Sequence, residues 1–120
     1  MDEIRNGVTT DQCNPRRLSR KLNLFLNENN ITKKTKRKRV LAWFLCASEQ
    51  GCKVTRFDAE HIGDHCLNST VSEIGRLDGI EVNRQETKRP NQFGSLTSCK
   101  EYWLDNDSKD KAAVFLGVTL

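Results

Sequence analysis

The sequence lacks any long hydrophobic run. No apolar segment approaches the ~20 residues that a membrane-spanning helix requires, and the longest, residues 40–47, suits a buried core helix. The first residues, MDEIRNG, also lack the apolar segment of a secretion signal. The sequence therefore predicts a cytoplasmic protein with no membrane association.

Motifs for catalysis and metal binding are also missing. There is no Gly-rich phosphate loop, no Ser-His-Asp spacing and no carboxylate pair in an apolar frame. His61 and His65 would approach one another as zinc ligands only if a helix continued through Gly63. None of the five cysteines forms a CxxC pair: Cys13, Cys46, Cys52, Cys66 and Cys99. We therefore predict no enzymatic activity, cofactor or metal site, and reduced thiols.

Charge is present in abundance but is unevenly distributed along the 120 residues. Residues 1–56 hold thirteen Lys and Arg against five Asp and Glu, a net charge of +8, whereas residues 57–120 hold seven against eleven, a net charge of −4. Six cations fall within residues 33–39, and such a run suits contacts to nucleic-acid phosphates. The alternative is an ordinary solvated helix start. We predict phosphate contacts for Lys36, Arg37, Lys38 and Arg39.

An amphipathic basic helix is expected near the N-terminus. Asn14 and Pro15 form a favourable helix start, and an apolar stripe follows at helical spacing: Leu18, Leu22, Phe25 and Leu26. Because this stripe is narrow, it must pack either on the main domain or on a second copy of the chain. The second alternative would make a homodimer through this helix.

Three further helices are expected after residue 32. The first is apolar nearly all round over residues 40–47, is capped by Thr32 or Thr35, and stops at Gly51. The second covers residues 56–62 and begins with a capping box. The third runs to residue 77, with Asn68 or Ser69 as its cap and one apolar face: Leu67, Val71, Ile74 and Leu77.

Two strands are expected beyond the last of these helices. Residues 80–84 and 99–104 alternate in polarity, and the polar residues 85–98 predict a long loop between them. Helix, turn, helix and β-hairpin is the order of a winged helix-turn-helix. We predict an α+β fold with a three-helix core and a β-hairpin wing over residues 33–105. An N-terminal arm bearing the extra helix occupies residues 1–32, and a C-terminal tail occupies residues 106–120.

This order of elements predicts double-stranded DNA as the partner. The outward face of the third helix offers short polar and basic side chains to base edges: Ser69, Thr70, Ser72 and Arg76. Cations on the wing suit the phosphate backbone: Arg84, Lys88 and Arg89. Each feature taken alone is also compatible with a solvated surface.

Four segments resemble the winged-helix modules of small phage and prophage proteins. They are Val40-Leu41-Ala42-Trp43-Phe44-Leu45, Thr55-Arg56-Phe57-Asp58-Ala59, Ile74-Gly75-Arg76-Leu77-Asp78-Gly79-Ile80-Glu81-Val82 and Tyr102-Trp103-Leu104. The resemblance implies a winged helix-turn-helix encoded by a mobile element and acting in the cytoplasm of a bacterial host cell. We expect a DNA-binding regulator of transcription or replication. The alternative is a protein-interaction module that binds and inhibits a host protein, such as RNA polymerase or a defence complex.

Overall fold

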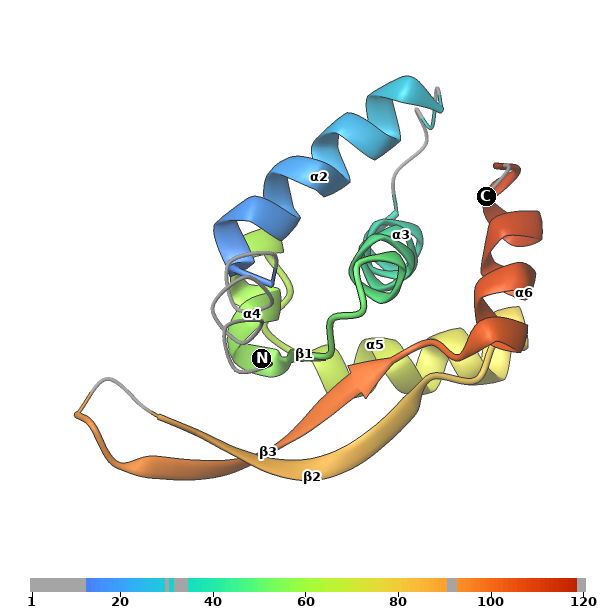
Figure 1. Cartoon of the computed structure of the whole chain (residues 1–120). Helices are drawn as coiled ribbons and strands as arrows, with labels where there is room; N and C mark the ends of the chain where they lie inside the picture. Colours follow the sequence, from blue (N-terminus) through green and yellow to red (C-terminus); the bar gives the residue numbers. More distant parts are fainter. Residues whose placement is uncertain (1–12, 30, 32–34, 91–92, 119–120) are drawn as a thin grey trace, which may run out of the picture.

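The chain folds into an α+β structure of helices around a small antiparallel sheet (Figure 1). The computed structural model describes residues 13–29, 31, 35–90 and 93–118. The helices are α2 (Pro15–Glu28), α3 (Lys36–Glu49), α4 (Arg56–Ala59), η1 (Glu60–Ile62), α5 (Leu67–Glu73), η2 (Ile74–Asp78) and α6 (Asn106–Leu116). The strands are β1 (Val54–Thr55), β2 (Asn83–Pro90) and β3 (Leu96–Trp103), in the spatial order β1-β3-β2.

Helix α3 is the centre of the structure. Its residues 40–47 are all buried, as expected for a segment that is apolar nearly all round. In Figure 1, α3 is seen almost along its axis, with α2 on one side and α6 on the other. Side chains from α2, α3, α5 and α6 share one hydrophobic core. The two flanking helices therefore pack on the same core as the expected three-helix unit.

Helix α2 begins where its sequence predicts. The Asn14 side chain accepts hydrogen bonds from the backbone N–H groups of Arg16 and Arg17, with Pro15 at the first helical position. The stripe of Leu18, Leu22 and Leu26 is buried, and α2 packs against α3. Of the two alternatives for this stripe, packing on the main domain is thus observed within the chain. The homodimer stays a prediction.

The expectation of reduced thiols is wrong for two of the five cysteines. Cys13 and Cys52 form a disulfide, with their Cα atoms 5.6 Å apart. Cys13 precedes α2 and Cys52 follows α3, and the two helices pack against each other. This arrangement brings together two residues that are 39 positions apart in the sequence.

The segment from β1 to η2 contains both confirmed and incorrect expectations. Thr55 accepts from the N–H of Asp58, whose carboxylate accepts from the N–H of Thr55, so the predicted capping box is present. The predicted cap at Asn68 or Ser69 is wrong, because α5 begins earlier with Cys66 at its N-cap position. Gly63 adopts a positive φ of 84° and closes the preceding turn.

The predicted inward position of Leu77 is also wrong, since its side chain is 58% exposed. The helix widens to a π-helix over Ile74–Asp78. A π-helix turns through a smaller angle per residue than an α-helix, so the apolar stripe of α5 does not continue to residue 77. The segment ends at Gly79, which has a φ of 71°.

The long polar loop predicted over residues 85–98 is wrong as well. Most of these residues belong to β2 and β3, which pair from Asn83 with Trp103 to Pro90 with Leu96. The strands are eight residues each, about 26 Å at the usual rise per residue. The hairpin therefore extends well beyond the helices (Figure 1).

The predicted C-terminal tail contains helix α6, which docks on α3. Asp105 caps this helix by accepting from the N–H of Ser108, and this hydrogen bond lowers the pKa of its carboxyl group. The Ser108 hydroxyl donates to the carbonyl of Glu81, and the N–H of Leu104 donates to the hydroxyl of Ser48. Among the described residues, no helix combines the length and apolar character needed to span a membrane.

Candidate nucleic-acid interface

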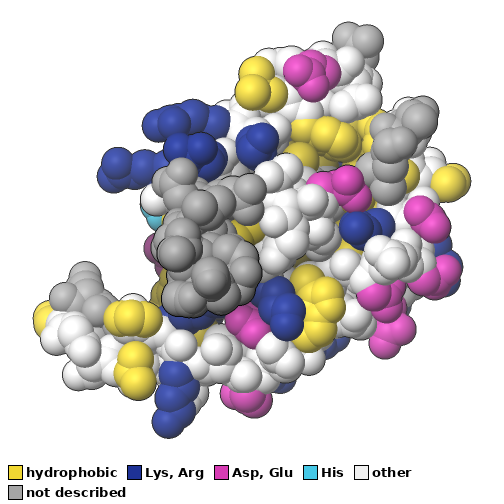
Figure 2. Space-filling model, viewed as in Figure 1, with side chains coloured by type: hydrophobic (Ala, Val, Ile, Leu, Met, Phe, Trp, Pro, Cys, Tyr) yellow, Lys and Arg dark blue, Asp and Glu magenta, His cyan; other side chains and the backbone are white. Residues whose placement is uncertain are grey.

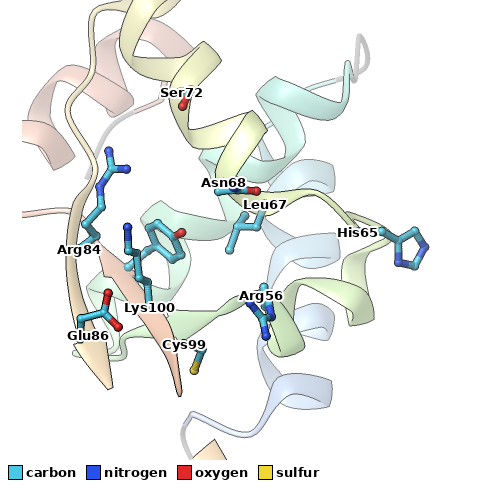
Figure 3. A pocket seen from close by; sticks show the side chains of 10 residues that line it. Arg56, His65, Leu67, Asn68, Ser72, Arg84, Glu86, Cys99 and Lys100 are labelled. Carbon is cyan, nitrogen blue, oxygen red and sulfur yellow. The ribbon is translucent and has the colours of Figure 1, made fainter. Parts of the chain in front are cut away.

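A groove separates α5 from the β2–β3 hairpin (Figure 3). Its volume is about 410 Å³, and residues from four elements and the turn before α5 line it: Arg56, His65, Leu67, Asn68, Ser72, Arg84, Glu86, Cys99, Lys100 and Tyr102. In Figure 3, Asn68 and Ser72 lie on the helix opposite Arg84, Glu86 and Lys100 on the hairpin, while His65 points away. We call this cavity the α5–hairpin groove.

The alternation of the hairpin decides which side chains reach the groove. Arg84 is paired with Tyr102 and Glu86 with Lys100, and all four side chains line the groove. Because neighbouring residues of a strand point to opposite faces, Lys88 lies on the same face as Arg84. The groove face of the hairpin therefore carries three cations and one carboxylate.

A second hollow, of about 400 Å³, continues the groove along η2. Ser72 and Arg84 line both hollows, and Gly75 and Arg76 line the second. The side chains of Ser72, Arg76 and Arg84 are all exposed. The α5–hairpin groove is thus the middle of a longer concave surface that follows the outer side of the α5–η2 segment.

Cations dominate the electrostatics of the groove. Three cations line it, namely Arg56, Arg84 and Lys100. Glu86 is the acidic residue among the lining side chains. Burial raises the pKa of Tyr102, and the charges of Arg84 and Arg56 oppose this effect. The Tyr102 hydroxyl therefore stays protonated at neutral pH and can donate a hydrogen bond to an anionic oxygen.

Two of the predicted DNA contacts take other positions. The prediction that Thr70 faces outward is wrong, because this side chain is 1% exposed and its hydroxyl donates to the carbonyl of Cys66. Arg89 lies on the opposite face of the hairpin from Arg84 and forms an ion pair of 3.1 Å with Glu101. Ser69, Ser72, Arg76, Arg84 and Lys88 are exposed, and Ser69 lies on α5 beside Asn68.

The basic run at the start of α3 makes contacts within the chain. Lys36 lies 3.5 Å from the buried Asp64, whose second oxygen has no hydrogen-bond partner among the described residues. Arg37 donates to the buried Asp78 at 2.9 Å, and Arg39 donates to the carbonyl of Ile62. Lys33 and Lys34 lie outside the described residues. These contacts join the start of α3 to the segments on either side of α5 and η2. The observed contacts of Lys36, Arg37 and Arg39 are therefore within the chain.

We expect Arg37→Ala to reduce stability and to leave DNA affinity unchanged. The substitution leaves the Asp78 carboxylate buried without its partner, which should cost about 1–3 kcal/mol of unfolding free energy. Lys38→Ala is the matched control, because Lys38 is the next residue of α3 and is not the partner of Asp64 or Asp78. Urea denaturation and duplex-DNA binding check the two effects. A stable Arg37→Ala protein with weakened DNA binding would restore the phosphate role predicted from the sequence.

Two cations of the groove carry no binding role in the sequence-based prediction. Arg56 is expected only as part of a helix and Lys100 only as part of a strand, yet both line the groove. The signal for Lys100 was its spacing of two from Tyr102, which places both on one strand face.

No group of three or more His, Cys, Asp or Glu side chains within the described ranges could hold a metal ion. Burial raises the pKa of the free thiol of Cys46 to about 12, so it is unreactive at neutral pH.

The α5–hairpin groove combines a helix with exposed polar side chains, a projecting hairpin and an excess of positive charge. No family model, curated protein or solved structure matches the chain.

Proposed function

We propose that the protein is a winged helix-turn-helix that binds double-stranded DNA and regulates transcription or replication. The observation that carries this proposal is the cationic groove between α5 and the hairpin. The order of the elements supports it: α3, α4 with η1, and α5 correspond to the three helices, and β2–β3 corresponds to the wing. The origin in a phage or prophage remains an inference from the resemblance.

In this proposal, the α5–η2 segment reads base edges. An α-helix has a diameter of about 10–12 Å, close to the width of a major groove. The exposed side chains available to the bases are Asn68, Ser69, Ser72 and Arg76. Asn can bond an adenine edge, Arg a guanine edge, and Ser either.

The hairpin and α4 supply phosphate contacts beside that helix. Arg84, Lys88 and Lys100 lie on the hairpin face toward α5, and Arg56 lies at the start of α4. Their positions around one groove allow a single phosphate backbone to contact several of them. Such contacts fix the orientation of a protein on DNA without reading its sequence.

The test is duplex-DNA affinity as a function of salt. We expect Arg84→Ala and Lys100→Ala each to weaken binding to mixed-sequence duplex and to reduce the salt slope by about 1, because each removes one phosphate contact. Lys111→Ala is the control, since Lys111 is an exposed cation on α6. Fluorescence anisotropy at several salt concentrations measures both quantities. Equal affinities and slopes for all four proteins would contradict the proposal.

A second candidate function is the binding of another protein through α6. Val114 and Phe115 are exposed on α6, and they line a hollow of about 410 Å³ together with Asp78, Gly79, Ile80, Asp110 and Lys111. Figure 2 shows acidic side chains around this side of the molecule. Exposed apolar patches with a polar rim often mark protein interaction sites. This candidate predicts a wild-type protein without salt-dependent DNA affinity, so the same experiment separates the two functions.

A further inference from the structure

Exposed arginines cluster on the first two turns of α2, and none of them lines the α5–hairpin groove. They are Arg16, Arg17 and Arg20, in a helix that holds no acidic residue before Glu28. Figure 2 shows Lys and Arg side chains gathered over the start of this helix. We call these three side chains the α2 basic face.

The α2 basic face is unfavourable for the helix that carries it. The N-terminal end of a helix has a partial positive charge, so cations in the first turn destabilise it. Arg16 and Arg17 lie in the first turn of α2, which contains no acidic residue. Arg16 and Arg20 are also four residues apart, a spacing at which like charges repel. The stability of α2 therefore does not explain these arginines, whereas an anionic partner does.

The start of α2 lies beside the hairpin. Asn14 lines a hollow of about 450 Å³ together with Asp58 of α4 and Arg89 of β2, and α2 also packs on η1. Arg89 and Arg84 lie on opposite faces of β2, because five positions separate them along the strand. Arg84 lines the α5–hairpin groove. The hairpin therefore stands between that groove and the start of α2.

The size of the molecule suits contact of both surfaces with one polyanion. Its longest extent is 39 Å, close to the 34–36 Å of about one turn of B-DNA. A duplex carries one negative charge per about 1.7 Å of its axis. A duplex whose backbone occupies the groove thus presents further phosphates over the whole length of the protein. Its uniform charge matches cations on both sides of the hairpin.

We propose that the α2 basic face binds the phosphate backbone of the same duplex that occupies the α5–hairpin groove, beyond the hairpin. The inference rests on the proposed function and extends the binding surface to a helix outside the winged helix-turn-helix unit. Arginine binds phosphate oxygens through two parallel hydrogen bonds. Phosphate contacts carry no sequence information, so α2 adds affinity without adding sequence preference.

The salt dependence of duplex affinity tests the α2 basic face. On a duplex of two helical turns, about 20 base pairs, the double variant Arg16→Gln/Arg20→Gln should bind more weakly and lower the salt slope by about 2. Its thermal stability should equal or exceed that of the wild type, because the repulsion within α2 is relieved. A structural role for these arginines predicts the opposite change in stability.

Lys21→Gln is the matched control on the same helix. Lys21 is also an exposed cation, but it lines the hollow between α2 and α3. Its variant should keep the salt slope of the wild type. A slope lowered by about 1 in Lys21→Gln as well would show an effect of net charge alone and overturn the proposed face.

Combination with Arg84→Ala tests whether both surfaces contact one duplex. The triple variant should lower the slope by about 3, since the two sets of phosphate contacts are then lost together. Titration at protein concentrations above the Kd should give one duplex per protein molecule. A second duplex that binds the wild type and is lost in the α2 variant would overturn the single-duplex inference.

The remaining outcomes separate this inference from the proposed function. A wild type without duplex affinity overturns both. A normal slope for Arg16→Gln/Arg20→Gln, with a reduced slope for Arg84→Ala, overturns the α2 inference alone and leaves DNA binding in the α5–hairpin groove intact.

Discussion

Replacing Trp43 with alanine is expected to reduce the unfolding free energy by about 3–5 kcal/mol. Trp43 belongs to the central helix α3, and its side chain is buried in the core. Its ring centroid lies 5.5 Å from that of Phe44. The substitution leaves a cavity in the one core that α2, α5 and α6 share with α3. A loss of this size is a large part of the total stability of a small domain. Urea denaturation followed by circular dichroism measures it.

Trp103→Ala is the control for this prediction. Trp103 is half-buried at the sheet surface, where the Lys53 ammonium lies 4.3 Å from its ring centroid. Because less apolar surface is lost there, the effect should be clearly smaller than that of Trp43→Ala. Equal losses for the two tryptophans would contradict a core centred on α3.

Loss of the disulfide is expected to have the next largest effect. Cys13 and Cys52 close a loop of 39 residues, and a crosslink of this span stabilises a protein by about 2–4 kcal/mol, mainly by restricting the unfolded chain. Cys52→Ser should reduce the unfolding free energy by this amount. Adding a reductant to the wild type should have a similar effect, and both are measured by urea denaturation.

Cys66→Ser is the control, because Cys66 is an exposed free thiol. It should unfold like the wild type under oxidising conditions. A wild type whose stability does not respond to reductant would show that the crosslink between α2 and the segment after α3 contributes nothing.

Local signals in the sequence predicted the starts of α2, α3 and α4. The caps at Asn14, Thr35 and Thr55 and the apolar stripe of α2 depend on residues within one or two turns. Side-chain capping and helical periodicity act over such distances. They are therefore readable without knowledge of the tertiary structure.

The errors arose where distant segments decide the structure. The disulfide depends on how α2 packs on α3, and no local pattern contains that information. Residues 85–90 are polar on both faces, so their sequence resembles a loop, yet pairing with β3 makes them a strand. The π-helix that exposes Leu77 begins at Ile74, beside Gly75. The low helix propensity of glycine indicates a weak point in the helix, but it does not predict a π-helix.

The candidate site was predictable in outline only. Ser72, Arg76 and Arg84 line the concave surface, as their predicted elements require. Lys88 lies on the same hairpin face as Arg84, although the sequence predicts a loop there. The intramolecular contacts of the basic run could not be predicted, because Asp64 and Asp78, which pair with two of its cations, lie far away in the sequence. Ion pairs between distant segments are invisible to charge counting.

A titration of isotope-labelled protein with duplex DNA, followed by amide chemical shifts, tests the central claim most directly. The account predicts the largest shifts in α5 and on the hairpin, at Asn68, Ser72, Arg84 and Lys100, with small shifts along α6. Increasing salt should reverse the shifts, because phosphate contacts release counterions. Shifts concentrated at Val114 and Phe115, or no shifts at all, would contradict binding of DNA in the α5–hairpin groove.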